Sequence, residues 1–472
     1  MPRNAWPLSD VVVEFAGQVA RSTDFALAAA GRRAQERLAQ PLCVAVVGRM
    51  KAGKSTLLNA LLETAISPTA GGECTEVVYV FQHGMHTTAV ANRRDGGDPV
   101  PVVFDGTTLP RALPIAAPEL RNIEVTLPVD LLSRASLVDT PGLASTSTER
   151  SALTERIVAD TVDAAAAADA LLFCVNGPLK DDEADAVRRF KAGRAGGRLT
   201  GGTAVGVLTR ADQEFGADRR LVWKKATELS RRMSVQHADL FSVVVPVIGL
   251  LAETVTTGAL RERHARGLGQ LARAWNPDTS DLALSHAELF VTEPGPLARG
   301  ERQELVDLLG LYGIAELLDA IRAGTAPHAA ALTAVAREVS GFDDMSARLR
   351  HALGERADVL KAAAALDELI ARAREAGDHS VHDRAQALLD RREMFPLRIM
   401  EMAQYLAQNR VRPPAGLAEE AWIAVTMGLP RVNAREAAAH AAGWREWGTL
   451  TDSMGQSVAR IMVRAWQLAV AP

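Results

Sequence analysis

The first part of the chain, up to residue 40, has the apolar spacing of one amphipathic helix. Apolar residues fall on a single helical face between residues 9 and 38, and Ser9 and Asp10 are suitable capping residues. The residues on this face are Val12, Phe15, Ala16 and Val19. Pro41 follows and ends the segment, so we expect a single helix before the next part of the chain begins.

The second part, from residue 41 to about residue 325, alternates between strand and helix patterns. The run LCVAVVG at 42–48 is wholly apolar and ends in a glycine, as expected of a strand buried on both faces. Several short β-rich runs follow between 77 and 175, and two more lie at 203–209 and 241–249. Helical patterns separate the later runs. This alternation predicts an α/β domain with a mostly parallel sheet.

The third part, from about residue 326 to the end, has almost no strand pattern. Apolar residues recur there at spacings of three and four, which predicts an all-α bundle with long helices. The sequence RVRPPAG at 410–416 interrupts the pattern. In the last predicted helix one face carries Val458, Ile461, Met462, Ala465 and Ala469.

Composition and charge narrow the class of protein. The 472 residues suffice for two or three domains, and 53 Lys and Arg against 57 Asp and Glu argue against a dedicated nucleic-acid binder. Cys43, Cys74 and Cys174 are few and far apart, which favours a reduced, cytoplasmic protein. The first residues lack the apolar core of a signal peptide, and no apolar run reaches the roughly 20 residues of a membrane span. Attachment to a membrane surface remains open.

The segment GRMKAGKST at 48–56 has the spacing of a phosphate-binding P-loop. Glycines let the backbone N–H groups point at phosphate oxygens, Lys54 supplies charge to the β- and γ-phosphates, and the Ser55 hydroxyl ligates Mg²⁺. The loop lies between a predicted strand and a predicted helix, which the motif requires. The residues expected at the nucleotide are Gly48, Met50, Lys51, Ala52, Gly53, Lys54, Ser55 and Thr56.

Two later motifs select the base and complete the phosphate site. In VDTPG, Asp139 can hold Mg²⁺ through water and the Gly142 N–H can meet the γ-phosphate. In LTRAD, which begins at Leu208 and includes Thr209, Asp212 can accept from guanine N1–H and the exocyclic amine while the Arg210 stem lies along the ring. Adenine offers an acceptor at the equivalent ring nitrogen and fits a carboxylate poorly. The motifs therefore predict GTP.

A candidate switch threonine lies between these motifs. Thr75, in PTAGGECTE, has a hydroxyl and a carbonyl that could reach Mg²⁺ and the γ-phosphate; the alternative is an ordinary loop threonine. The predicted magnesium ligands are therefore Ser55, Thr75 and Asp139.

With these motifs in this order, the chain resembles the dynamin superfamily, and specifically bacterial dynamin-like proteins of the isoniazid-inducible, IniC-type group. The long gap between Lys54 and Asp139, with its extra strands, is similar to the enlarged dynamin GTPase domain. The resemblance is specific over residues 41–325 and architectural beyond them. It implies an N-terminal neck helix at 1–40, a GTPase domain at 41–325, and a helical stalk with a C-terminal neck helix at 326–472.

The same resemblance implies a function. Such a protein would bind and hydrolyse GTP with Mg²⁺, associate through its GTPase domains or with a related dynamin-like protein, and remodel or maintain the cell membrane from its inner face, where anionic lipid is the expected contact. In eukaryotic dynamins a Gln and a Ser match Met50 and Lys51, and they place water and help hold a monovalent cation. Met50 cannot orient water, so Thr75, a backbone carbonyl or a partner would have to do so. Lys51 either supplies the missing charge and is catalytic together with Lys54 and Thr75, or points to solvent or a dimer interface.

Two other functions stay open from the sequence. One is a GTP-binding, weakly hydrolysing subunit of a dynamin-like heteromer. The other is a translation or ribosome-assembly GTPase, for which a strongly basic segment is missing.

The helical third of the chain carries two further ambiguities. Four tryptophans lie after residue 420, and they form either the core of the bundle or a membrane-facing tip; they are Trp422, Trp444, Trp447 and Trp466. Basic and apolar residues mix at 390–416, which suits either a lipid-touching tip or a solvated hairpin. We also expect the 9–38 helix to pack on the 456–470 helix as a neck, with Trp466 in that interface.

Overall fold

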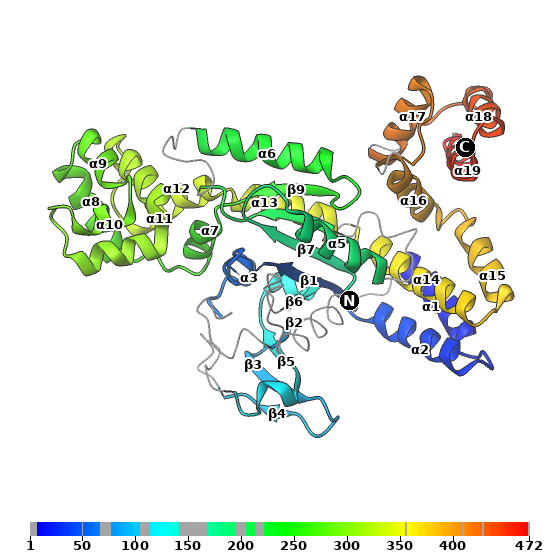
Figure 1. Cartoon of the computed structure of the whole chain (residues 1–472), viewed down its shortest axis with the longest axis horizontal. Helices are drawn as coiled ribbons and strands as arrows, with labels where there is room; N and C mark the ends of the chain where they lie inside the picture. Colours follow the sequence, from blue (N-terminus) through cyan, green and yellow to red (C-terminus); the bar gives the residue numbers. More distant parts are fainter. Residues whose placement is uncertain are drawn as a thin grey trace.

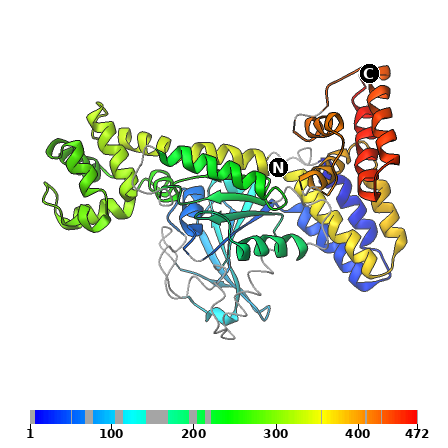
Figure 2. The ribbon, with the colours of Figure 1, turned by 45° about the horizontal axis from the view of Figure 1, so that its top comes forward.

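A computed structural model describes most of the chain. The described residues are 7–49, 51–66, 77–103, 113–140, 168–193, 204–212, 221–354, 356–407, 410–426 and 429–470. They form a central sheet with a helical lobe at one end and further helices at the other (Figure 1). The chain returns from the lobe along the sheet before it enters the last helices (Figure 2).

The described strands form one nine-stranded sheet in the order β4-β3-β5-β2-β6-β1-β7-β8-β9. They are β1 Leu42–Gly48, β2 Tyr79–His83, β3 Thr88–Arg93, β4 Val100–Pro101, β5 Leu120–Leu127, β6 Ala135–Asp139, β7 Ala170–Val175, β8 Ala204–Leu208 and β9 Val243–Pro246. β1 pairs parallel with β6 and β7, and β7, β8 and β9 continue in parallel. β2 and β5 are also parallel, while β2–β6, β3–β4 and β3–β5 are antiparallel. The prediction of a mostly parallel α/β sheet is confirmed.

Helices cover this sheet and extend it into the lobe. Those next to the sheet are α3 Lys54–Leu62, α5 Asp181–Gly193 and α6 Val222–Gln236, with short 3₁₀ turns at Ala117–Glu119 and Asp130–Ser133. The lobe consists of α7 Gly249–Thr256, α8 Glu262–Ala274, α9 Pro277–Ala283, α10 Ala287–Thr292 and α11 Arg299–Arg322. The helices α12 Ala329–Ser340 and α13 Phe342–Leu349 then return to the sheet.

α12, which follows the predicted domain limit at residue 325, is bonded to the sheet side of the molecule. The Ile248 N–H at the end of the sheet donates to Ser340 O at 2.9 Å, and the Trp223 indole N–H donates to Val339 O at 3.2 Å. These bonds attach α12 to the sheet side of the molecule. The Ala-rich helical pattern of this region is the same in helices that cover a sheet and in helices of a stalk, so periodicity alone does not locate the boundary.

The amino-terminal segment is two helices, so the prediction of a single helix over 9–38 is wrong. α1 spans Pro7–Val19 and α2 spans Phe25–Ala39. Asp24 interrupts the pattern because its side chain caps α2 by accepting from Leu27 N–H at 2.8 Å. The predicted cap of the first helix is also wrong, because its N–H groups at Leu8 and Ser9 donate to Asp358, both at 2.8 Å. The predicted apolar face is buried throughout.

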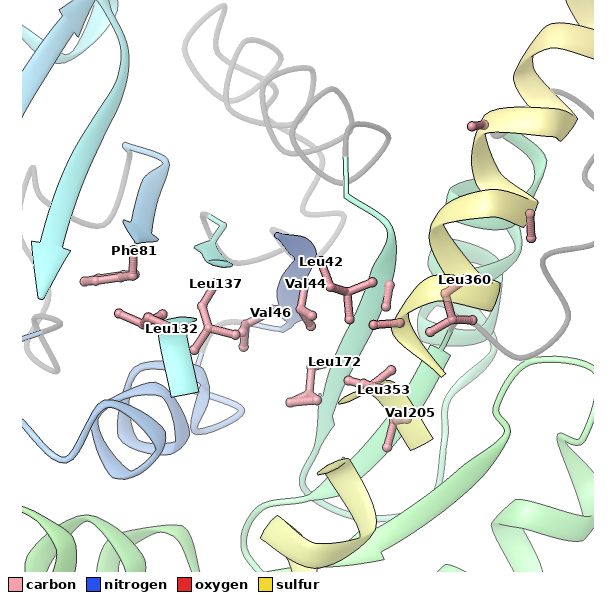
Figure 3. Close-up of a cluster of buried hydrophobic side chains, with 14 of the residues drawn as sticks. Leu42, Val44, Val46, Phe81, Leu132, Leu137, Leu172, Val205, Leu353 and Leu360 are labelled. Carbon is pink, nitrogen blue, oxygen red and sulfur yellow. The ribbon is translucent and has the colours of Figure 1, made fainter. Parts of the chain in front are cut away.

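α1 and α2, the helices predicted to form a neck, pack against α14 rather than against the last helix of the chain. α14 Ala357–Glu375 follows a π-helical turn at Arg350–Gly354 and contacts both α1 and α2. It is followed by α15 His379–Leu389. The hydrophobic core that starts under β1 runs through Leu353 and Leu360 toward these helices (Figure 3). An apolar stripe predicts that a helix has a partner, but it does not identify which helix that partner is.

The joint between neck and sheet is polar and largely buried. Asp169, 1% exposed, accepts from Arg37 Nε at 2.7 Å and from Cys43 N–H at 2.9 Å. The Lys361 ammonium of α14, 2% exposed, donates to Leu38 O at 2.7 Å and also to Gln40 O. Burial lowers the pKa of Lys361, although Asp169 and Asp358 raise it. Main-chain carbonyls therefore hold a buried cation where α2 passes into β1.

Most buried residues of the last four helices form a separate core. The four helices are α16 Phe395–Ala407, α17 Ala415–Thr426, α18 Ala434–Thr449 and α19 Ser453–Leu468. We call these helices the C-terminal module. Leu397 and Met400 of α16, by contrast, belong to the core that starts under β1. α19 packs on α18 and α16, so the expected pairing of the 456–470 helix with the amino-terminal helix is wrong. Leu397, Met400 and Met402 of α16 are buried, so these apolar residues of the 390–416 segment do not face a membrane.

A carboxylate holds the tryptophans of the C-terminal module. Trp444 and Trp466 are buried, and both indole N–H groups donate to Glu420 Oε2, at 2.9 and 3.0 Å. His440 Nδ1 lies 2.8 Å from Glu420 Oε1, and its ring stacks on Trp466. The bundle-core interpretation is confirmed for these two tryptophans, and Trp466 belongs to this module rather than to the neck. Trp422 is 45% exposed.

Candidate nucleotide-binding site

Three of the predicted motifs meet at one edge of the sheet. The P-loop follows β1, Asp139 ends β6, and Thr209 to Asp212 follow β8. β6, β1, β7 and β8 are neighbouring parallel strands, so their carboxyl ends lie together. In open α/β sheets this edge is where ligands bind.

Glycines give the P-loop its tight course. A Cβ on Gly48 would lie 2.6 Å from Cys174 O, so only glycine fits against β7. Gly53 has a φ of 79° and packs against the Thr209 side chain. Lys51 is exposed and has a φ of 62°, in the left-handed region that L residues with a side chain seldom adopt. The loop therefore curls as a phosphate cradle does, and Lys51 is held at its turn.

Lys54 lies folded across the loop. The residue is 9% exposed, and its ammonium donates to Gly48 O at 3.2 Å and to Arg49 O at 3.1 Å. Burial lowers the pKa of Lys54, while the nearby Asp139 and Cys174 raise it. Two neutral carbonyls solvate this cation weakly, so an anionic phosphate is a better partner.

Two threonines fix the loop to the sheet. The Thr209 hydroxyl donates to Ala52 O at 2.6 Å and also lies 3.1 Å from Val175 O, while its carbonyl accepts from Gly249 N–H at 3.0 Å. The Thr140 hydroxyl donates to Val46 O at 2.9 Å. Sequence reasoning assigned no role to Thr140, although its position directly after Asp139 at a strand end was available as an indication.

Ser55 and Asp139 suit a magnesium ion. Ser55 is half-buried in the first turn of α3, and Asp139 is 8% exposed at the end of β6. A hydroxyl and a carboxylate supply the oxygen ligands that Mg²⁺ prefers, so these residues would hold it. Thr56 is half-buried one position further along α3. The other predicted residues Met50, Thr75 and Gly142 lie outside the described residues.

Asp212, the carboxylate predicted to bind the base, is half-buried. Burial raises the pKa of Asp212, while its own backbone N–H and Arg210 lower it. The Arg210 backbone pairs with Ile248, which joins the end of β8 to the start of α7. A half-buried carboxylate is stabilised by hydrogen-bond donors, and guanine offers two such donors on one edge.

The P-loop helix has a further polar contact that the sequence did not indicate. Asn59 of α3 donates to Glu253 Oε1 of α7 at 2.7 Å. Burial raises the pKa of Glu253, and the Asn59 bond lowers it. Asn59 lies within an apolar stretch, and the residue that it contacts is far away in sequence, so no local pattern links the two. The bond ties the second half of α3 to the lobe.

A P-loop after the central strand of a mostly parallel sheet, with Asp139 and the LTRAD segment at neighbouring strand ends, defines a nucleotide-binding domain of the P-loop class. Residues 44–175 match the family described as the dynamin family.

Two kinds of curated relatives are similar to the chain. Isoniazid-induced protein IniC of Mycobacterium tuberculosis, in strains CDC 1551 and H37Rv, is 34% identical over 293 residues, which are 61% of this chain and 58% of that protein. A bacterial dynamin-like protein of Nostoc punctiforme is 31% identical over 114 residues, which are 21% of this chain and 16% of that protein. The chain thus spans less than two thirds of the length of these relatives.

A solved structure aligns along nearly the whole chain. It is described as an oligomerised bacterial dynamin pair that provides a mechanism for long-range sensing and tethering of membranes. The alignment covers 99% of this chain and 75% of that one, at 15% identity and a TM-score of 0.36.

Within the part of the chain that the structure describes, none of the helices combines the length and the apolar character that crossing a membrane would need.

Proposed function

We propose that the chain binds and hydrolyses GTP with Mg²⁺, associates through its GTPase domain, and remodels or maintains a membrane. The observation that carries the proposal is the convergence of Lys54, Asp139 and Asp212 at one edge of the sheet. Lys54 and Asp139 are buried and Asp212 is half-buried. Each belongs to a motif with a different part of a guanine nucleotide as its expected partner.

Lys54 has the most direct role. On binding, its ammonium exchanges the carbonyls of Gly48 and Arg49 for the β- and γ-phosphates. Thr209 keeps the loop in place during this exchange, because its bond to Ala52 does not involve the ligand. Mg²⁺, when bound, neutralises charge that develops on the phosphates, and Ser55 and Asp139 would hold it, with Thr75 as the predicted third ligand.

Lys51 supplies the second positive charge in this proposal. The backbone holds it at the turn of the loop, and its exposed side chain is free to reach a nucleotide. An ammonium there would offset charge at the bridging oxygen between the β- and γ-phosphates, and hydrolysis would then need no Na⁺ or K⁺. If Lys51 instead belongs to a dimer interface, the charge comes from a partner subunit.

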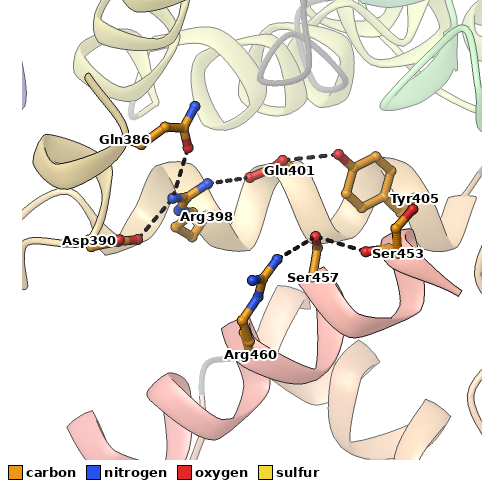
Figure 4. A network of polar contacts seen from close by, with 8 residues as sticks. All are labelled: Gln386, Asp390, Arg398, Glu401, Tyr405, Ser453, Ser457 and Arg460. Atoms are coloured by element: carbon orange, nitrogen blue, oxygen red, sulfur yellow. Dashed lines mark hydrogen bonds and ion pairs between the residues drawn. The ribbon is translucent and has the colours of Figure 1, made fainter. Parts of the chain in front are cut away.

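The membrane part of the proposal is supported by arginines on the C-terminal module. Arg445, Arg460 and Arg464 line a surface cavity of about 560 Å³, and the described residues around it include no carboxylate. Arg398, by contrast, is paired with Asp390 at 2.8 Å and Glu401 at 3.0 Å (Figure 4). The face between α18 and α19 therefore offers arginines to anionic lipid, while Arg460 and Arg464 also line a second cavity that contains Asp390 and Glu401.

Single-turnover hydrolysis with purified chain, with and without anionic liposomes, tests the proposal. Lys54→Ala should abolish GTP binding, because the loop loses its cation. Lys51→Met should keep GTP affinity and lower kcat by about 100-fold. Wild-type affinity in Lys54→Ala would refute the site. GTP binding without turnover would support the heteromeric-subunit alternative instead, and K⁺ stimulation of the wild type would remove Lys51 from catalysis.

A further inference from the structure

The lobe helix α11 is broken beside the predicted base-reading carboxylate. Gly310, inside the span Arg299–Arg322, has a φ of 64° and a ψ of 171°, which is not helical. This is a conformation that essentially only glycine adopts. A Cβ built on Gly310 would lie 3.8 Å from Asp212 Oδ2 and 3.7 Å from Leu250 Cδ2. The backbone of α11 thus passes Asp212 with no side chain between them.

Several contacts fix α11 in this position. The Thr254 hydroxyl of α7 donates to Leu308 O at 2.5 Å, two residues before the break. A Cβ on Gly313 would lie 2.5 Å from Leu251 Cδ2, so α11 approaches α7 as closely as glycine permits. α7 in turn is bonded to the end of β8 through Gly249 N–H and Thr209 O. The break therefore occurs where the lobe is held most closely to the nucleotide site.

The groups around the break fit one edge of a purine. Asp212 offers a carboxylate for two ring-edge donors, and Leu250 offers an apolar contact for the ring. We propose that the α11 backbone at Gly310 forms the third wall of the guanine subsite, and that its missing side chain helps to set base specificity. This inference rests on the proposed GTP binding and extends it, since it assigns part of base recognition to the lobe.

A side chain at position 310 would act on the base and not on the phosphates. It would force the backbone out of its glycine conformation and would shift α11 relative to Asp212. The phosphates are held by Lys54 and the P-loop, which are anchored separately through Thr209 and Ala52. Loss of affinity should therefore depend on the presence of the guanine.

Binding measurements on Gly310→Ala and Gly310→Leu test this separation. We expect GTP affinity to fall about tenfold or more, and affinity for inorganic tripolyphosphate with Mg²⁺ to stay within about twofold. Gly258→Ala is the control for a side chain added to a lobe glycine with positive φ: Gly258 has a φ of 65° and nothing within 4 Å of its Cβ position. This control should change neither affinity.

Hydrogen exchange on the wild-type chain covers the case in which a variant does not fold. GDP should slow amide exchange at 306–322, and tripolyphosphate should not. The inference would be overturned if the Gly310 variants lost affinity for GTP and tripolyphosphate equally, or lost no more GTP affinity than Gly258→Ala does. It would also be overturned if GDP and tripolyphosphate had the same effect on amide exchange at 306–322. A wild type that fails to prefer GTP over ATP would instead refute the proposed function, so the two failures are distinguishable.

Discussion

The lobe and the C-terminal module are both helical, but they relate differently to the sheet. Phe290 and Leu317 of the lobe share one hydrophobic core with Phe173 of β7. Trp444 and Met462 of the module belong to a separate core. A shared core couples two regions in stability, whereas a separate core allows independent unfolding. The lobe is thus coupled in stability to the sheet, whereas the module has most of its buried residues in its own core and meets the core under β1 through Leu397 and Met400 of α16.

The largest loss of stability should come from removing one large aromatic side chain from each core in turn. Trp444→Ala and Phe290→Ala both remove a fully buried aromatic ring, at a cost of about 3–5 kcal/mol. Urea denaturation followed by far-UV circular dichroism, with GTP affinity measured in parallel, should show that Trp444→Ala lowers one transition and leaves GTP binding intact. Phe290→Ala should lower the transition that GTP stabilises. One common transition in both variants would contradict the division.

An intermediate effect should follow from changing the carboxylate that the tryptophans share. Glu420→Gln keeps the size of the side chain but replaces an acceptor with an amide donor that faces other donors, at a cost of about 1–3 kcal/mol to the module. Its exposed neighbour Glu419→Gln is the control and should have little effect. If the two variants have the same midpoint of thermal unfolding, the hydrogen bonds to Glu420 add nothing to stability.

The smallest effect concerns the link between α3 and the lobe. The pKa of Glu253 is raised in the folded chain, so the folded state binds the proton more tightly than the unfolded state does. The stability from this group is therefore fully present at low pH and is lost as pH rises from the unfolded pKa through the folded one. In urea titrations at a series of pH values from 4 to 8, Glu253→Gln should reduce the fall in the free energy of unfolding by up to about 1 kcal/mol. An unchanged slope would show that Glu253 does not titrate in this window.

Features with a short-range cause were the predictable ones. β1 spans the predicted 42–48, because an apolar strand buried on both faces is bounded by Pro41 and Gly48. The fold class followed from the same reasoning. The break before α2 was missed because the apolar spacing continues through it, and only the capping bond of Asp24 shows where the new helix begins.

Features that depend on distant partners could not be predicted. α14 as the neck partner, Glu420 beneath two indoles, and Gly310 beside Asp212 all join residues far apart in sequence. Hydrophobic periodicity predicts that a face is covered, and polar spacing predicts local caps. Neither kind of pattern carries the identity of a residue that arrives from another element.

The buried ammonium of Lys361 has a mechanical consequence for the joint between neck and sheet. It holds the carbonyls of Leu38 and Gln40, so a swing of α14 away from β1 would leave a cation in a nearly dry site. Separating a buried cation from its acceptors costs free energy unless other acceptors or water replace them. The two bonds from Lys361 therefore resist a change in the angle between α14 and β1.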